Sequence, residues 1–265
     1  LRADRNVCIS QCSSNACYVG TETHEGCPFN NAGPRLHSNR LCNLCAKCVK
    51  NCPHGAMTLS LRMPGREIWE SRRHKQGTAF LVLGLLAGLI SEMICRIPIG
   101  EQLKAVLPLG EMGRFTVIFV AFIAVVNICF ALAVGISRRT SGEPFRENYA
   151  RYGLALLPLA LLGYFAFHLY FLLKIGVQLP ILVKEKFDFA VFDRLMFQAP
   201  LHLVHIAQVV LVLAGLAWSL MVIYRLGRSD HEEIGKAVAG VAPHACLATI
   251  MGLILIKAIG AYFYG

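Results

Sequence analysis

The sequence is poor in charge. Only 16% of its 265 residues are Asp, Glu, Lys or Arg, whereas 55% are hydrophobic and the mean hydropathy is +0.53. These values exceed those of ordinary soluble proteins and predict membrane-spanning segments. Acidic residues are scarcer than basic ones, 16 against 26, which gives a formal net charge of +10. Because the basic residues lie mainly between apolar stretches, we attribute their excess to membrane topology and not to nucleic acid binding.

The sequence also lacks an initiator Met and a recognisable signal peptide. It begins at Leu1, shortly before its first Cys, so we expect it to be a piece of a longer or processed chain. Large apolar residues are scarce over residues 1–60, which are polar, rich in Cys and interrupted by Gly and Pro. A segment with so little material for a core would depend on bound metal centres for its stability.

Cysteine is abundant in this N-terminal segment, which contains eight of the 11 Cys residues. Four of them form the run Cys42-Asn-Leu-Cys45-Ala-Lys-Cys48-Val-Lys-Asn-Cys52-Pro53. The spacing Cys-x2-Cys-x2-Cys-x3-Cys-Pro is typical of bacterial ferredoxins that hold two cubane iron–sulfur clusters. Three thiolates at this spacing can surround one face of a cluster, and Pro53 stops a helix from continuing after Cys52. A zinc site or a disulfide knot is the alternative, although zinc sites usually present two separated Cys pairs.

The other four cysteines follow a looser pattern. Cys8, Cys12, Cys17 and Cys27 are spaced Cys-x3-Cys-x4-Cys-x9-Cys, and the last again precedes Pro. Together the two runs supply the eight thiolates that two [4Fe–4S] clusters need. The crossed arrangement of two-cluster ferredoxins implies one cluster on Cys8, Cys12, Cys17 and Cys52, and a second on Cys42, Cys45, Cys48 and Cys27. This pairing is a hypothesis, and an uncrossed first site or bound zinc is the alternative.

Five apolar stretches follow, each close to the roughly 20 residues that a bilayer requires. We expect transmembrane helices at about 77–97, 115–136, 149–173, 200–224 and 237–262. The predicted fold class is mostly α: a small α+β ferredoxin domain of bacterial type at residues 1–63, an interfacial linker at 64–76 and a five-helix transmembrane bundle at 77–265. Alternating residues predict a short strand at Ala56–Arg62. Trp69 in the linker suits the membrane–water boundary.

The basic residues predict the orientation in the membrane. We call the face from which the chain enters its first span side A and the opposite face side B. Twelve Lys and Arg residues flank the spans on side A and seven on side B. Because Lys and Arg are enriched on the cytoplasmic side, we expect the ferredoxin domain to face the cytoplasm from the inner cell membrane. A reducing compartment also suits thiols that bind clusters instead of forming disulfides.

Ionisable residues within the spans are candidates for further chemistry. His168 and His205 each lie about six residues from the side-B end of neighbouring spans, which at roughly 1.5 Å per residue gives them a similar depth. They are candidate ligands of a b-type haem, or contacts of a quinone, and His202 is an alternative partner one turn earlier. Packing between helices is the remaining interpretation. His244 is nearer side A and matches His168 poorly in depth.

Other polar residues of the membrane region have weaker signals. Glu92 could relay protons, anchor a quinol or simply lie at the interface, and His231 is expected to be solvated. Asp188 and Asp193, among several Phe residues, predict an amphipathic segment on side B. Packing within the bundle is expected for the three isolated cysteines, Cys95, Cys129 and Cys246.

The Cys runs, the following stretch Leu61-Arg-Met-Pro-Gly-Arg-Glu-Ile-Trp69 and the spans resemble the membrane-anchored ferredoxin proteins. That family includes the quinol-dehydrogenase ferredoxin of periplasmic nitrate reduction and the maturation ferredoxins of nitrous-oxide reductase and cytochrome oxidase. The resemblance covers residues 1–75 by motif and the remainder by architecture. It implies two clusters on the cytoplasmic side that exchange electrons with the quinone pool or a partner enzyme. The spacing of the first Cys run and the five-span C-terminal part depart from the family pattern.

The sequence therefore predicts a membrane-bound iron–sulfur electron-transfer subunit of a multi-subunit, respiratory-type oxidoreductase. Electrons would pass between a cytoplasmic redox partner and quinone or a membrane haem. Basic residues near the ligands would raise the cluster potential and could dock an acidic partner; they are Arg35, Arg40, Lys47 and Lys50. The alternative is an assembly factor that supplies electrons to reduce a metal or cofactor of another enzyme. A redox sensor or transporter fits least, because no binding module or pair of broken helices is evident.

Overall fold

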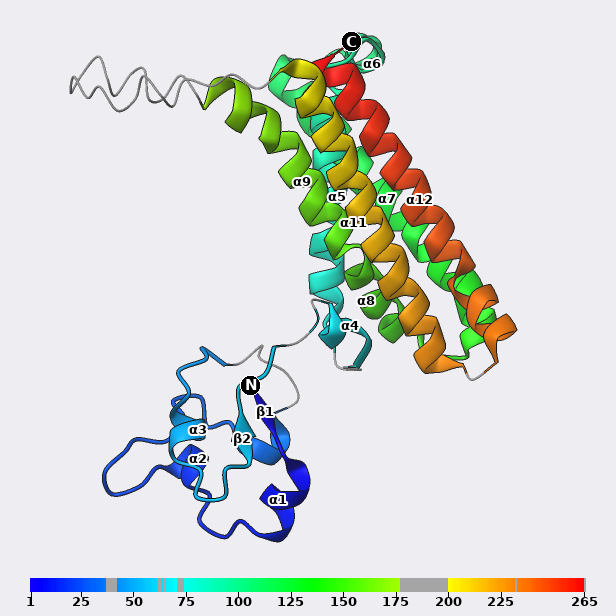
Figure 1. Ribbon diagram of the computed structural model, residues 1–265. Coiled ribbons are helices and arrows are strands. Elements are labelled where there is room, and N and C mark those ends of the chain that lie inside the picture. Colours follow the sequence, from blue (N-terminus) through cyan, green and yellow to red (C-terminus); the bar gives the residue numbers. More distant parts are fainter. Residues whose placement is uncertain are drawn as a thin grey trace, which may run out of the picture. The chain divides into compact units, whose positions relative to one another are not determined.

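The computed structural model (Figure 1) describes residues 1–36, 42–61, 63, 65–70, 74–176, 200–231 and 233–264. Contacts divide the chain into two units, Leu1–Ser71 and Arg72–Gly265. Several predicted features lie outside the described residues, namely Arg40, the side chain of Arg35 and the amphipathic segment with Asp188 and Asp193.

The first unit consists of short elements joined by loops. They are β1 (Arg2–Ala3), α1 (Arg5–Ser10), α2 (Ala16–Val19), the 3-10 turn η1 (Gly33–Arg35), α3 (Lys47–Lys50), β2 (Met57–Thr58) and α4 (Arg66–Glu70). Of the strand predicted at Ala56–Arg62, the described residues form only β2. The first unit buries few apolar side chains, as the sequence indicated; among the described residues they are Leu1, Ala16, Ala56, Met57 and Ile68.

Asp4 joins the two ends of this unit. β1 and β2 pair antiparallel, with Arg2 opposite Thr58 and Ala3 opposite Met57. The pairing continues at Asp4, whose backbone N–H donates to the carbonyl oxygen of Ala56 at 2.8 Å. The Asp4 carboxylate then accepts hydrogen bonds from the first backbone N–H groups of α1, which makes Asp4 the N-cap of that helix. Helix α1 therefore starts beside the segment that follows the second Cys run.

The second unit is a helical bundle. Its elements are α5 (Gln76–Ile94), α6 (Pro98–Val106), α7 (Glu111–Ser141), α8 (Phe145–Ala155), α9 (Leu157–Tyr170), the π-helical turn η2 (Phe171–Ile175), α11 (Leu201–Asp230) and α12 (Ile234–Phe263). Within the described residues, five segments are long and apolar enough to cross a membrane: Gln76–Ile94, Glu111–Arg139, Phe145–Lys174, Leu201–Asp230 and Ile234–Phe263. The five predicted spans are thus confirmed. Several helices run past their predicted limits, because a helix can continue into the interface after its apolar stretch ends.

The third span is broken where α8 meets α9. Pro158 lies in the first turn of α9 and has no backbone N–H to donate to α8. The next residue, Leu159, donates its N–H to the hydroxyl oxygen of Ser219 on α11 at 3.1 Å. Ser219 is fully buried. A neighbouring helix thus pairs a backbone group freed by the break, as the lack of water in a bilayer requires.

Small residues let the helices approach closely. A Cβ atom at Gly153 of α8 would lie 2.6 Å from the Cβ of Ala79 on α5. A Cβ at Gly227 of α11 would lie 2.3 Å from Cγ1 of Val241 on α12. Neither distance is tolerated between carbon atoms, so these contacts need glycine. Such small-residue contacts are typical of helices that pack in a membrane, where lipid tails remove the hydrophobic driving force for association.

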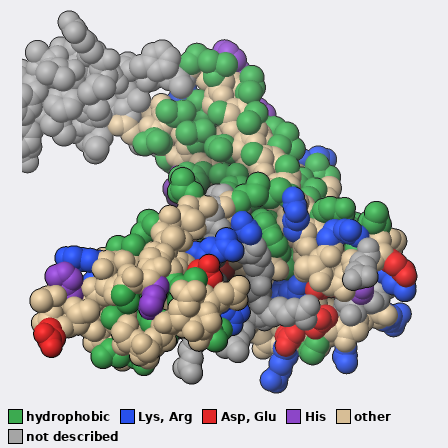
Figure 2. Space-filling view, turned by 60° about the horizontal axis from the view of Figure 1, so that its bottom comes forward, with side chains coloured by type: hydrophobic (Ala, Val, Ile, Leu, Met, Phe, Trp, Pro, Cys, Tyr) green, Lys and Arg blue, Asp and Glu red, His purple; other side chains and the backbone are tan. Residues whose placement is uncertain are grey.

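The flank of the bundle is covered with exposed apolar side chains, while charged residues lie toward its ends (Figure 2). Exposed large side chains occur on every long helix, among them Leu81, Val120, Phe165, Leu213 and Leu253. A soluble monomer rarely exposes a continuous apolar surface of this kind. A lipid bilayer is the environment in which this surface is favourable.

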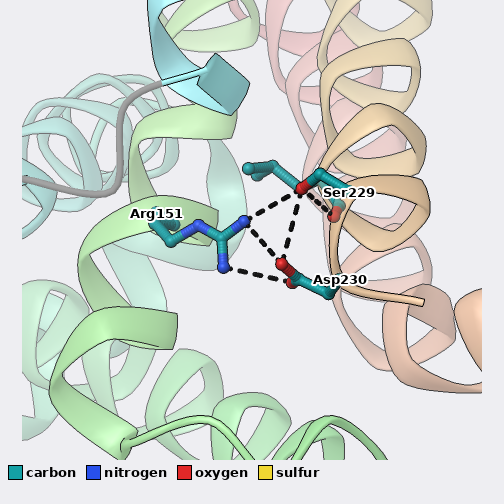
Figure 3. Close-up of polar contacts among 4 residues, drawn as sticks. Arg151, Ser229 and Asp230 are labelled. Carbon is teal, nitrogen blue, oxygen red and sulfur yellow. Dashed lines mark hydrogen bonds and ion pairs between the residues drawn. The ribbon is translucent and has the colours of Figure 1, made fainter.

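One ion pair lies within the bundle at its side-A end (Figure 3). Arg151 of α8 makes two hydrogen bonds to the carboxylate of Asp230 at the end of α11, at 2.8 and 3.1 Å, and a third to the hydroxyl of Ser229 at 3.1 Å. Both charged side chains are only 2% exposed. Arg151 is one of the twelve side-A basic residues that predict the orientation in the membrane. In the structure its side chain is buried and joins α8 to α11.

Removing either charge of this pair should destabilise the bundle strongly. We expect Arg151→Ala or Asp230→Ala to lower the free energy of unfolding by about 3–5 kcal/mol, because the remaining charge would stay buried without its partner. Thermal unfolding of the detergent-solubilised protein measures the effect. Lys236→Ala is the control, since the pair of Lys236 with Glu233 is 65% and 70% exposed and should contribute at most about 1 kcal/mol. Equal unfolding temperatures for Arg151→Ala and Lys236→Ala would contradict the prediction.

Candidate functional site

The eight N-terminal cysteines are all described and all have free thiols. None forms a disulfide, and each is at least partly accessible, with Cys45 the most exposed. A disulfide knot, one alternative to a metal centre, is therefore not what this unit forms in the structure.

The first group of thiols is assembled across the two Cys runs. Burial raises the pKa of Cys8, and the neighbouring thiols of Cys52, Cys17 and Cys12 raise it further. These are the four cysteines that the crossed arrangement assigns to one cluster. The β1–β2 pairing explains the grouping, because α1 with Cys8 begins beside Ala56 and Cys52 lies four residues before Ala56.

The second group is centred on Cys48 in α3. Burial raises the pKa of Cys48, a backbone N–H donated from Val49 lowers it, and the thiols of Cys42 and Cys27 raise it. Cys27 comes from the first run, so the second group is crossed as well. The exposed Cys45 lies between Cys42 and Cys48 in the sequence and would be its fourth member.

Two contacts with Glu25 bring Cys27 toward α3. The ammonium of Lys47 lies 2.6 Å from the Glu25 carboxylate. The side-chain amide of Asn51 donates to the backbone carbonyl of Glu25 at 2.9 Å. Both partners of Glu25 flank Cys48, and Glu25 precedes Cys27 by two residues. The loop spacing in the sequence gives no hint of these contacts.

Around the second Cys run two residues have a strained backbone, and two backbone N–H groups donate to sulfur. Leu44 and Ala46 both have a φ of 59°, which residues with a side chain rarely adopt. The N–H of Leu44 donates to Sγ of Cys42 at 3.4 Å, and the N–H of Ala56 donates to Sγ of Cys52 at 3.3 Å. Hydrogen bonds to sulfur are among the factors that set the potential of an iron–sulfur cluster.

Eight thiols are the number of ligands that two [4Fe–4S] clusters would need. In the described part of the chain, no three His, Cys, Asp or Glu side chains are close enough together to hold a single metal ion. A cube of four irons spreads its thiolates more widely than one ion does, so neighbouring thiols without close convergence are compatible with a cluster. Gly33 packs closely beside Cys8, because a Cβ at Gly33 would lie 3.2 Å from the Cys8 sulfur and 3.1 Å from that of Met57.

In the membrane unit, His168 and His205 have different neighbours. His168 bonds through Nδ1 to the carbonyl of Tyr164 at 2.9 Å and lies among aromatic rings of α9 and η2. His205 contacts the tilted ring of Tyr264, with ring centroids 4.4 Å apart, and approaches Gly260 of α12. His202 is exposed at the start of α11. Among the described residues no contact joins His168 to either of the others, so a haem ligated by such a pair remains a prediction.

His168 lines a groove of about 830 Å³ between α5, α7 and α9. Three polar side chains lie in it: Glu92 of α5, and Tyr164 and His168 of α9. The rest of the lining is apolar and includes Phe80, Leu81, Phe115, Phe119, Ile123 and Phe167. Sequence reasoning missed this groove. Its signal was the spacing of Gly77, Gly84 and Gly88, which places three small residues on one face of the first span.

Glu92 has the ion pair of an interfacial residue and also lies in the groove. Its carboxylate pairs with Arg96 one turn later at 2.6 Å, as expected for an interfacial residue, and it also lines the groove. The guanidinium of Arg96 in turn lies 5.9 Å from the ring centroid of Tyr262 on α12. This chain of contacts fixes the side-B end of α5 against α12.

The other candidates of the membrane region are separate from the groove. His244 is 1% exposed and stacks on Tyr152 at 4.1 Å, and neither ring nitrogen has a hydrogen-bond partner among the described residues. His231 was expected to be solvated, but its Nε2 atom is buried. Packing within the bundle is confirmed for Cys95, whereas Cys129 and Cys246 are exposed on its surface.

Comparisons with protein-family models, with curated proteins and with solved structures found no match to this chain.

The unpartnered imidazole of His244 gives a test of its role. We expect His244→Phe to raise the free energy of unfolding by about 1 kcal/mol, because a ring of similar shape would replace buried polar atoms that lack partners. Thermal unfolding and the absorption spectrum of the dithionite-reduced protein are measured together, with His202→Phe as an exposed control. A fall in stability accompanied by loss of sharp reduced bands would contradict the prediction and make His244 a haem ligand.

Proposed function

We propose that this chain is a membrane-bound iron–sulfur protein that transfers electrons between a cytoplasmic redox partner and an acceptor or donor in the membrane, either quinone or haem. The observation that carries the proposal is that seven of the eight free thiols neighbour one another in two sets, each drawn from both Cys runs. The lipid-facing helices support a membrane location. The excess of basic residues on side A supports a cytoplasmic thiol unit.

The thiol unit would hold one cluster on Cys8, Cys12, Cys17 and Cys52 and the other on Cys42, Cys45, Cys48 and Cys27. Bound clusters would supply one-electron oxidation and reduction. The protein contributes the setting of the potential: the N–H groups of Leu44 and Ala56 donate to sulfur, and Lys50 adds positive charge. The charge of Lys47 is partly offset by Glu25. The two hydrogen bonds and the charge of Lys50 each favour negative charge at the neighbouring thiolates.

Exchange with a partner protein would take place at the exposed edge of the second group. Cys45 is the most exposed of the eight thiols, and the apolar side chain of Leu44 beside it is 52% exposed. Lys50 lies on the same short segment and is also exposed. An exposed apolar side chain with a positive charge nearby is suited to docking an acidic electron-transfer protein.

Iron content tests the proposal directly. We expect about eight irons and eight sulfides per chain, with a broad absorption near about 400 nm that dithionite bleaches, because two [4Fe–4S] clusters would be bound. Cys8→Ser and Cys52→Ser should each lose the same cluster and leave identical electron paramagnetic resonance signals. Cys48→Ser and Cys27→Ser should each lose the second cluster and leave only the signal of the first. Cys129→Ser, outside both groups, is the control.

Two results would contradict this assignment. A wild-type chain with zinc, or without a chromophore that dithionite bleaches, would end the electron-transfer proposal. If Cys52→Ser matched Cys48→Ser instead of Cys8→Ser, the clusters would be uncrossed, with each run holding its own.

Charge reversal tests the docking edge. We expect Lys50→Glu to slow reduction of the chain by reduced flavodoxin, a small acidic donor, about tenfold at low ionic strength, because the positive field that steers the donor would be lost. Stopped-flow absorption measures the rate, and the difference should vanish at about 0.5 M salt, where charges are screened. Lys236→Glu, on the bundle, is the matched control. An equal effect of both variants would exclude docking at α3.

A further inference from the structure

The groove between α5, α7 and α9 has the proportions of a site for a long amphiphile. It is lined by α5 from Gly77 to Glu92, which at roughly 1.5 Å per residue is about 22 Å. The hydrocarbon core of a bilayer is about 30 Å thick, so the groove extends over most of one membrane crossing. Its three polar side chains are confined to α5 and α9 residues near side B. An occupant would therefore have a small polar head near side B and an apolar tail directed toward side A.

The floor of the groove is kept open by glycine. A Cβ atom at Gly77 or Gly84 would have no atom within 4 Å. At Gly88 it would lie 3.2 Å from the ring of Phe119 and 3.8 Å from the hydroxyl of Tyr164. Gly88 thus preserves the space next to the polar end, and Gly84 preserves the space for the tail.

The polar end offers hydrogen-bond acceptors. The hydroxyl of Tyr164 donates to the carbonyl of Leu85 at 3.1 Å, so only its oxygen lone pairs are available to a ligand. Nδ1 of His168 lies 2.9 Å from the carbonyl of Tyr164, and since a carbonyl can only accept, Nδ1 carries the proton. In the tautomer with its proton on Nδ1, Nε2 has a free lone pair and accepts hydrogen bonds. The Glu92 carboxylate is a third acceptor, and Arg96 engages it from one side.

Three acceptors around one apolar groove call for a ligand whose head donates hydrogen bonds. The head of a quinol has two hydroxyl donors, whereas the carbonyls of a quinone and the phosphate of a phospholipid only accept. A phosphate would also meet the negative charge of Glu92. The tail of an isoprenoid quinol matches the apolar lining and the length of the groove.

We propose that this groove binds an isoprenoid quinol in preference to the corresponding quinone, with its head at Glu92, Tyr164 and His168. The inference rests on the proposed function, whose membrane reactant it names and locates. It assigns Glu92 and His168 as contacts of the two hydroxyl groups, at the side-B end of the bundle. The site is separate from His205 and His244, which face other helices.

Binding of decylubiquinol and decylubiquinone to the detergent-solubilised chain, measured anaerobically by calorimetry, tests the preference. We expect the quinol to bind at least about fivefold more tightly, the effect of one additional hydrogen bond. Glu92→Gln replaces an acceptor with an amide that also donates. The affinities for decylubiquinol and decylubiquinone should then be nearly equal. Gly84→Leu should fill the tail space and weaken both ligands about tenfold or more. Gly135→Leu, at an α7 glycine that also has no atom within 4 Å and lies outside the groove, should change neither.

The outcomes separate this inference from the proposed function. Equal binding of quinol and quinone by the wild type, or an unchanged preference in Glu92→Gln, would overturn it. Displacement of decylubiquinol by equimolar oleic acid would overturn it too, by showing that the groove takes any lipid chain. Iron content is measured on the same samples. Preferential quinol binding by a chain without iron would support this inference and contradict the proposed function. An iron-containing chain without a preference for quinol would contradict this inference and leave the proposed function standing.

Discussion

The thiol unit depends on the antiparallel pairing of two very short strands. Arg2–Ala3 and Met57–Thr58 are separated by more than fifty residues, and their pairing is extended by the hydrogen bond from Asp4 to Ala56. Asp4 then caps α1, so the same residue closes the sheet and starts the helix that holds Cys8. Without this closure Cys8 and Cys52 would belong to independent loops. Few apolar side chains are buried here, so bound clusters would provide much of the stability that the core cannot.

The membrane unit is held together by a different balance of forces. Lipid offers apolar surroundings equal to those inside the bundle, so its helices associate through close packing and polar contacts. Gly153 against Ala79 and Gly227 against Val241 bring backbones together. The Arg151–Asp230 ion pair joins α8 to α11 at side A. Further along the same span, the helix is interrupted between α8 and α9, next to Pro158. Helix α8 packs on α5 and α9 packs chiefly on α11, while residues of α9 line the groove together with α5 and α7.

The sequence predicted the parts that depend on local pattern and composition. Five spans follow from apolar stretches of sufficient length, and the second Cys run indicates its chemistry through spacing alone. Contacts between distant segments could not be read in this way. Glu25 lies near Cys27, but only the fold brings it to Lys47 and Asn51. Depth along a helix placed His168 and His205 at one level, yet depth does not determine the facing direction, and the two rings lie against different helices.

The position of the groove constrains how electrons would travel. Its polar end lies near side B, whereas the chain enters the bundle at Gln76 on side A. Electrons taken from a quinol head in the groove would have to cross most of a bilayer about 30 Å thick to reach side A. Protons released from such a quinol would leave toward side B, and electrons would cross to side A. A transfer over that length needs an intermediate carrier, and His244, the buried imidazole toward side A, is expected to pack within the bundle and not to bind a haem. A carrier supplied by a further subunit agrees with a packing role for His244, and a multi-subunit complex is then the form in which both sites can act together.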